Sequence, residues 1–279
     1  MDGPLEGGAV SVVIAALKKG EAVVLKIHPP WENYSRSTGS SAQTEAAALR
    51  IWEGKGAPRL YASDTQALLI EHISPAEHSP AMSAKEVAAL VTQIARPIDD
   101  QNSPAIPHIY HELWKRYLRA YANRHDEISE TLLMTTATMT NYMLGDRALQ
   151  SCELVHGDFK TKNILKRPDG TFVVIDPSPA IGNKLYDVAL WAIEEPESIL
   201  ERCEETAHYL RVGPQIIGSL AVALAIPEIC LASPARAQKT LESVREITGT
   251  ANLLDYFLND FIEDDFMGGS YHVSEPPNT

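Results

Sequence analysis

Residues 154–165, LVHGDFKTKNIL, and residues 171–182, TFVVIDPSPAIG, form the stretch that decides the fold. Strand-forming residues at 164–166 and 171–175 stand on either side of Asp169-Gly170, which is a strong turn signal. This pattern predicts a β-hairpin. A short apolar run at 154–155 predicts another strand, which leads into the hairpin through a polar loop.

Three polar side chains accompany the predicted hairpin. Asp158 lies in the loop before it, where Gly157 permits a tight turn. Asn163 stands at the start of the first strand and Asp176 at the end of the second, so pairing of the strands brings these two together. Amide and carboxylate oxygens are the ligands that Mg²⁺ prefers. The loop then holds Asp158 where it can accept a proton from a substrate hydroxyl.

The run His156-Gly157-Asp158, with Asn163 five residues after the aspartate and Asp176 after a strand, resembles the aminoglycoside phosphotransferases. These enzymes share the protein-kinase fold, whose H-R-D-x-x-x-x-N loop and D-F-G motif carry the same chemistry. The IDP run and Tyr186-Asp187-Val-Ala-Leu are most similar to the streptomycin 6-kinase and hydroxyurea phosphotransferase branch. The resemblance implies an ATP-dependent and Mg²⁺-dependent kinase of small cationic substrates, such as the antibiotic streptomycin.

The resemblance also implies roles for single residues. Asp158 would be the catalytic base or would orient the attacking hydroxyl, while Asn163 and Asp176 would bind Mg²⁺. Lys160 would stand near the γ-phosphate and offset charge on the transferring group, although many family members have histidine there. His156 would support the loop, and Asp187 would brace it by accepting backbone N–H bonds. For Lys160, His156 and Asp187, a purely structural role remains an open alternative.

The first 73 residues predict a small lobe with a sheet. Two β-branched runs flank Lys18-Lys19-Gly20, a helix pattern covers 42–54, and residues 59–73 read as a second hairpin that turns near Ser63-Asp64. In the resembled family a strand lysine contacts the ATP phosphates and pairs with a helix glutamate, which selects Lys26 and Glu45. The alternative is that Lys26 extends into solvent from an edge strand.

Residues 68–73, LLIEHI, resemble the hinge that meets adenine. The resemblance implies that backbone groups near Glu71 and Ile73 bind the nucleotide, while the Glu71 side chain either joins the lobes by an ion pair or contacts the ligand. One departure stands at the N-terminus: the family has a further strand and a phosphate-covering loop before the first hairpin, whereas only MDGPLEGG precedes it here.

From residue 74 onward the pattern is mainly helical. Ser83 and Glu86 form a capping-box signal. Two long helical patterns follow, and residues 185–261 read as helices separated at prolines or glycines. The whole predicts an α+β, two-lobed, protein-kinase-like fold, with an N-lobe at 1–73 and a larger, mostly helical C-lobe at 74–279 around a cleft. The expected helix breaks are at Pro196, Gly213-Pro214, Pro227 and Pro234.

The overall charge bears on possible partners. The chain has 279 residues with 24 Lys plus Arg against 37 Asp plus Glu, a net charge of -13. This balance disfavours a nucleic-acid partner, which needs clustered cations, and suits a cationic small molecule, although solubility alone explains it equally well. The three cysteines are too scattered for a disulfide or metal framework, and neither a signal peptide nor a membrane span is evident, so we expect a cytoplasmic location. The oligomeric state stays open.

Two acidic clusters are candidates for binding a cationic substrate. The first follows residue 193, and the second, near the C-terminus, alternates with phenylalanines that suit a cationic sugar. For each cluster, a solvated helix face is the alternative reading. The first comprises Glu194, Glu195, Glu197, Glu201, Glu204 and Glu205, and the second contains Asp260, Glu263, Asp264 and Asp265, of which Asp260, Glu263 and Asp264 are the predicted substrate contacts.

Two other functions remain open at this point. The same fold would serve a metabolic kinase for an amino sugar or a similar small molecule. A nucleotide-binding pseudokinase without activity would belong to a different class. The short N-terminus favours the pseudokinase, whereas the intact set of Lys26, Glu45, Asp158, Asn163 and Asp176 opposes it.

Overall fold

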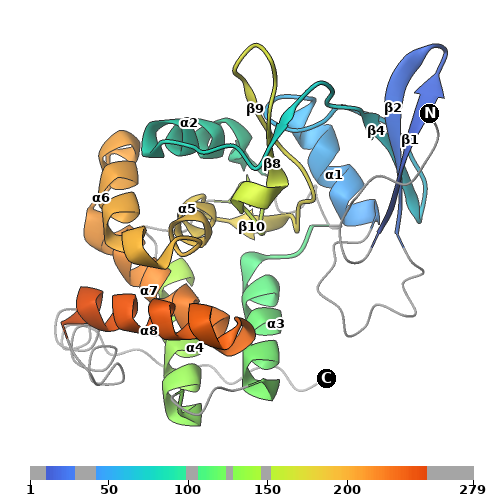
Figure 1. The fold of residues 1–279 in the computed structure, drawn as a ribbon. Coiled ribbons are helices and arrows are strands. Elements are labelled where there is room, and N and C mark those ends of the chain that lie inside the picture. The colour runs from blue at the N-terminus through green and yellow to red at the C-terminus, as the bar shows by residue number, and fades with distance from the viewer. Residues whose placement is uncertain (1–10, 29–41, 99–105, 124–127, 146–151, 250–279) are drawn as a thin grey trace.

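The computed structural model describes residues 11–28, 42–98, 106–123, 128–145 and 152–249 (Figure 1). Its N-terminal part is an antiparallel four-stranded sheet, in the order β1-β2-β4-β3, with one helix, α1, packed against it. In Figure 1 this sheet and α1 lie on one side of the molecule and helices α3 to α8 on the other. The elements are β1 Val12–Lys18, β2 Glu21–Ile27, α1 Ala42–Trp52, β3 Leu60–Ser63 and β4 Ala67–Glu71.

The first hairpin turns where the sequence predicts. Lys19 and Gly20 both have positive φ, 51° and 89°, and Lys18 pairs with Glu21 across the turn. Two successive residues with positive φ match the twist of the flanking strands, which is why short hairpins favour glycine here. The hairpin sets the register of β2 and therefore the side of the sheet on which Lys26 lies.

The remaining part contains two small antiparallel sheets, in the orders β10-β7-β6 and β5-β8-β9, and most of the helices. The predicted hairpin is confirmed as β8 paired with β9. The capping box is confirmed as well, with Ser83 and Glu86 exchanging hydrogen bonds at the start of α2. The strands are β5 Glu77–His78, β6 Arg96–Pro97, β7 Glu153–Val155, β8 Ile164–Lys166, β9 Phe172–Val174 and β10 Ala180–Gly182. The helices are α2 Ala84–Ile94, α3 Ile109–Ala122, α4 Glu130–Gly145, α5 Leu185–Ala192, α6 Ile199–Leu210, α7 Pro214–Leu231 and α8 Pro234–Thr248, with 3₁₀ turns η3 Thr161–Asn163 and η4 Pro196–Ser198.

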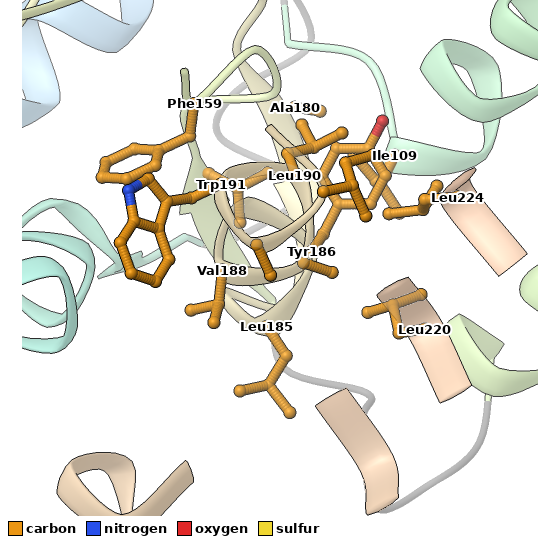
Figure 2. Packing of buried hydrophobic residues seen from close by; sticks show 14 of the residues in the cluster. Ile109, Phe159, Ala180, Leu185, Tyr186, Val188, Leu190, Trp191, Leu220 and Leu224 are labelled. Carbon is orange, nitrogen blue, oxygen red and sulfur yellow. The ribbon is translucent and has the colours of Figure 1, made fainter. Parts of the chain in front are cut away.

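The core of the helical part is built around α7 and α5. Helix α7 packs against α3, α4, α5, α6 and α8, and Figure 2 shows Leu220 and Leu224 of α7 facing Tyr186 and its neighbours on α5. Within the described residues α7 is the one helix long and apolar enough to cross a membrane, and most of it is buried inside the protein. A helix that is apolar on every side is also what the centre of a globular core requires.

The predicted helix break at Pro227 is wrong, because α7 continues through this residue. A proline inside a helix has no N–H to donate to the carbonyl four residues earlier, here that of Ala223. The hydroxyl of Tyr117, on α3, donates to this carbonyl at 3.0 Å. The neighbouring helix therefore supplies the hydrogen bond that Pro227 cannot make. The breaks at Pro196, Gly213-Pro214 and Pro234 are confirmed as element boundaries.

We expect Tyr117→Phe to lower the free energy of unfolding by about 1–3 kcal/mol, because it leaves the buried carbonyl of Ala223 without a donor. In a Pro227→Ala background the same change should cost less, since the new backbone N–H at position 227 can serve that carbonyl. Urea denaturation of the four proteins of this cycle measures the difference. Tyr209→Phe, at an exposed position of α6, is the control, and equal costs in both backgrounds would contradict the interpretation.

Candidate active site

The loop between β7 and β8 makes a backbone contact that only glycine allows. Gly157 has φ 78°, and a Cβ atom added there would lie 1.9 Å from the carbonyl oxygen of Ser178. The backbone N–H of Ser178 donates to the carbonyl of His156 at 2.9 Å. The loop that carries Asp158 is therefore packed directly on the segment that follows Asp176. These backbone contacts bring Asp158 and Asp176 toward each other.

Asp187, in the first turn of α5, accepts two backbone hydrogen bonds from the same loop. One of its carboxylate oxygens accepts the N–H of His156 at 2.7 Å, and the other accepts the N–H of Gly157 at 2.9 Å. Its side chain is buried. Burial raises the pKa of Asp187 to about 7, although the two N–H donors oppose the shift.

His156 lies behind the loop in an apolar setting. Its ring stacks on Trp52 with 6.3 Å between centroids and meets Phe159 edge-on at 6.0 Å. Nε2 is 3.0 Å from the carbonyl oxygen of Ile175, so this nitrogen carries the proton. Complete burial lowers the pKa of His156, which favours the neutral ring. This geometry gives His156 a supporting place beneath the loop.

Asp158 is the partly exposed carboxylate of the loop. Lys160 Nζ lies 2.9 Å from Oδ1, and the Asn163 side-chain nitrogen donates to Oδ2 at 3.1 Å and to the Asp158 carbonyl at 2.9 Å. Burial favours the neutral acid, but the charges of Lys160 and Arg116 outweigh it and hold the pKa of Asp158 below its ordinary value. Asp158 is therefore ionised at neutral pH.

The β8–β9 pairing places Asn163 beside Ile175, the residue that precedes Asp176. The N–H of Ile175 donates to the carbonyl of Asn163 at 2.8 Å, directly before Asp176. Asp176 has φ 53°, a left-handed conformation that is strained for any residue with a side chain. Such strain is common at functional sites, where the surrounding structure holds a side chain in a required direction.

Lys26 joins the sheet to this cluster. Its ammonium group donates to both oxygens of Glu45, at 2.9 and 2.7 Å, and to Asp176 Oδ1 at 2.7 Å. The alternative of an edge-strand lysine is wrong, because β2 lies between β1 and β4 and Lys26 is only 6% exposed. Burial disfavours the charged ammonium, but the carboxylates of Glu45 and Asp176 outweigh this and raise the pKa of Lys26.

His28 was not singled out from the sequence. It follows β2, its side chain is buried, and its Nε2 lies 3.2 Å from Oε2 of Glu45. Residues two apart in a strand share one face of the sheet, so the spacing from Lys26 to His28 was the available signal. Oε2 of Glu45 therefore contacts both Lys26 and His28, which fixes the position of the carboxylate.

The predicted hinge residues make contacts between the two parts of the chain. Glu71 accepts a hydrogen bond from Arg167 of the β8–β9 hairpin at 2.8 Å, and its other oxygen accepts the N–H of Arg59 at 3.1 Å. The structure thus shows the joining ion pair that was one of two alternatives for this side chain. Ile73 packs with Leu165 and Val173 of the hairpin. Contact of either backbone with adenine stays a prediction.

The acidic clusters have different outcomes. Asp260, Glu263 and Asp264 lie outside the described residues. In the first cluster, Glu197 is exposed and pairs with Lys239 at 2.6 Å, as a solvated face predicts. Glu194 is not simply part of a solvated face, because its carboxylate accepts hydrogen bonds from Thr161 in the loop that carries Asp158. Contact of this cluster with substrate stays a prediction.

The oxygen atoms of Asn163 and Asp176 fit a hard divalent cation. Because the Asn163 nitrogen donates to Asp158, its amide oxygen is the atom left for a metal. No group of three or more His, Cys, Asp or Glu side chains that could hold a metal occurs among the described residues. Two protein oxygens suit Mg²⁺ in particular, which keeps several waters and takes its remaining ligands from phosphates.

Comparison with known proteins gives one family. The model of the aminoglycoside/hydroxyurea antibiotic resistance kinase family matches residues 2–226. A search of curated proteins gave no match.

Solved structures share the fold at low sequence identity. Choline kinase LicA from Streptococcus pneumoniae has a TM-score of 0.60 at 13% identity, with 89% of this chain and 93% of that chain covered. A putative fructosamine-3-kinase from Thermobifida fusca YX-ER1 has a TM-score of 0.58 at 17% identity, with coverages of 88% and 93%. A thermostable mutant of aminoglycoside phosphotransferase APH(4)-Ia, in a ternary complex with AMP-PNP and hygromycin B, has a TM-score of 0.57 at 13% identity, with coverages of 91% and 93%. The expected α+β, two-lobed, kinase-like fold is confirmed.

We expect Gly157→Ala to lower the free energy of unfolding by more than about 3 kcal/mol, because the added Cβ collides with the Ser178 carbonyl in addition to the unfavourable φ. Gly170→Ala is the matched control: its φ is 84°, with no atom within 4 Å of the added Cβ. It should lose only about 1 kcal/mol. Urea denaturation compares the two, and similar losses would show that the close approach is absent.

The raised pKa of Asp187 predicts a pH dependence of stability. Folded Asp187 binds its proton more tightly than the unfolded chain does, so its contribution to stability is lost as pH rises from about 4 through about 7. Asp187→Asn removes this titration. We therefore expect the free energy of unfolding of the wild type, relative to this variant, to fall by about 2 kcal/mol between pH 5 and pH 8. A difference that is independent of pH would contradict the shift.

Proposed function

Because the chain belongs to the aminoglycoside/hydroxyurea antibiotic resistance kinase family, we propose that it phosphorylates a hydroxyl group of a cationic aminoglycoside, with streptomycin as the first candidate. Membership makes the chain a small-molecule kinase, which transfers phosphate from ATP to a hydroxyl. The substrate, the metal and the roles of single residues are our proposal. Its main support is that Lys26, Glu45 and Asp176 form one connected cluster beside Asn163 and Asp158.

In the proposed mechanism, Lys26 binds the α- and β-phosphates of ATP while Glu45 and His28 orient its ammonium group. Residues 1–73 form the nucleotide lobe, and backbone groups near Glu71 and Ile73 contact adenine. The ion pair between Glu71 and Arg167 joins this lobe to the β8–β9 hairpin.

Asn163 and Asp176 would hold Mg²⁺, which when bound neutralises charge on the phosphate oxygens. The remaining steps fall to side chains of the loop. Asp158 accepts a hydrogen bond from the acceptor hydroxyl and aims its oxygen at the γ-phosphorus. As the new P–O bond forms and the bond to ADP breaks, the hydroxyl proton passes to Asp158. Lys160, beside Asp158, offsets negative charge on the transferring group.

A metabolic kinase for a small amine or amino sugar is the second candidate. It is supported by the fold shared with structures described as a choline kinase and a putative fructosamine-3-kinase. The intact set of Lys26, Glu45, Asp158, Asn163 and Asp176 argues against a nucleotide-binding pseudokinase, because the groups proposed for the transfer step have no use in a protein that only binds the nucleotide. We place the enzyme in the cytoplasm, where ATP and such substrates meet.

A substrate panel tests the proposal. Purified protein is given ATP and Mg²⁺ with streptomycin, hygromycin B, hydroxyurea, glucosamine or choline, and ADP release is measured. We expect the highest kcat/KM with streptomycin. A preference for glucosamine or choline would favour the metabolic alternative, and ATP binding without turnover of any acceptor would favour the pseudokinase.

We expect Asp158→Asn to lower kcat by about 10²–10⁴-fold, because an amide cannot accept the hydroxyl proton. ATP binding, measured by calorimetry, should change little, since Asp158 is not a phosphate ligand in the proposed mechanism. Asp169→Asn is the matched control: this exposed aspartate accepts bonds from Thr171 in the hairpin turn, which an amide oxygen can also accept. Turnover that survives in Asp158→Asn would remove Asp158 from the chemistry.

A further inference from the structure

Two acidic residues at opposite ends of α5 contact the loop that carries Asp158. Asp187 lies in the first turn of α5, and Glu194 directly follows its C-cap, Ile193. They are two helical turns apart, so they lie on the same side of the helix. Asp187 accepts the N–H groups of His156 and Gly157, as described above. The carboxylate of Glu194 accepts the N–H of Thr161 at 2.7 Å and its hydroxyl at 2.6 Å.

The donors of these bonds flank Asp158 on both sides. Thr161 opens the 3₁₀ turn η3, whose last residue is Asn163, and the N–H of Asn163 donates to the carbonyl of Lys160 at 2.8 Å. The first N–H groups of a helical turn have no partner within the turn. The Glu194 carboxylate supplies one for Thr161, and charge-assisted bonds of this kind are short and strong. The backbone from 156 to 161 is therefore attached to one helix at each end.

Helix α5 is a rigid base for these two contacts. All of its residues are buried, and Figure 2 shows its apolar side chains surrounded by the core. Two arginines from other helices hold its C-terminal end. Arg236 of α8 donates to the carbonyls of Ile193 and Glu194 at 3.3 and 2.9 Å. Arg202 of α6 donates to the carbonyl of Trp191 at 2.8 Å and lies over its ring at 4.2 Å.

We propose that Glu194 is a positioning residue for phosphoryl transfer. Through Thr161 it fixes the turn that connects Lys160 to Asn163, and it thereby sets the side chains on either side of the proposed acceptor hydroxyl. The inference rests on the proposed function, because it concerns the geometry of that reaction. Displacement of catalytic groups by about 1 Å is enough to lower a rate by about 10²-fold, so a clamp outside the pocket can control kcat.

Three variants test this role. Glu194→Ala removes both bonds, Glu194→Gln keeps an acceptor oxygen without the charge, and Thr161→Val removes only the hydroxyl. ADP release gives kcat and the KM for ATP, with streptomycin as acceptor and also without an acceptor. Hydrogen exchange of the amides in residues 156–163 reports the loop itself, and thermal unfolding reports the fold. Glu197→Ala, an exposed acid on the same segment paired with Lys239, is the control.

We expect Glu194→Ala to lower kcat by about 10- to 100-fold, with less than about a threefold change in the KM for ATP. Glu194→Gln should recover part of kcat, and exchange of the Thr161 amide should accelerate in Glu194→Ala but not in Glu197→Ala. The double variant Glu194→Ala/Thr161→Val should have a kcat no lower than that of Glu194→Ala alone, because both substitutions disrupt the same contact between Glu194 and Thr161.

Two failures are distinguishable. Absence of turnover in the wild type contradicts the proposed function. If the wild type turns over and Glu194→Ala changes kcat by less than about twofold, only the positioning role is contradicted. The positioning role is also contradicted if Glu194→Gln recovers none of the kcat lost in Glu194→Ala and that loss follows the fraction of unfolded protein. If Glu194→Ala does not fold, a kcat for Thr161→Val equal to that of the wild type overturns the inference.

Discussion

A buried ammonium group, that of Lys26, determines how the sheet meets the rest of the molecule. Burial of an unpaired charge is so unfavourable that a lysine would lose its proton instead. Lys26 keeps its proton because Glu45 and Asp176 both lie within 2.9 Å, one from α1 and one from the end of the β8–β9 hairpin. Three segments distant in the sequence must therefore converge on one atom. The ion pairs of Lys26 thus attach both α1 and the end of the β8–β9 hairpin to strand β2.

Hydrogen bonds and ring stacking hold α1 in the same arrangement. Trp52, at the end of α1, donates its indole N–H to the carbonyl of Ile94 on α2 at 2.8 Å and stacks on His156. The N–H of Val174 in β9 donates to the carbonyl of Gly56 at 2.8 Å. Helix α1 through Trp52, and the loop after it through Gly56, are thus attached to the rest of the molecule in addition to the Lys26 ion pairs. The ion pairs of Lys26 position the functional groups, and the contacts of Trp52 and Gly56 keep them in that position.

Local patterns in the sequence were sufficient for much of this. Turn chemistry and strand composition predicted the three hairpins β1–β2, β3–β4 and β8–β9. The spacing of Asp158, Asn163 and Asp176 predicted that the β8–β9 pairing brings these residues into one region. The failures depend on tertiary neighbours. Pro227 does not end α7 because Tyr117, far away in the sequence, serves the free carbonyl. In the sequence, Glu194 is one member of an acidic run that indicates either a substrate-binding cluster or a solvated helix face, and only the fold shows that Thr161 lies beside it.

The low pKa of Asp158 bears on which chemistry the loop supports. Lys160 and Arg116 keep Asp158 ionised, and a carboxylate with a low pKa is a weak base. Such a group removes little of the proton from an alcohol before the bond to phosphorus forms, so it acts mainly by orientation. In a loose, metaphosphate-like transition state the bond to the nucleophile is little formed, so the rate depends on alignment of the reacting groups more than on the strength of the nucleophile. Rigid attachment of the loop through Asp187 and Glu194 supplies that alignment, which is why the contacts beneath Asp158 matter as much to this site as the basicity of the carboxylate.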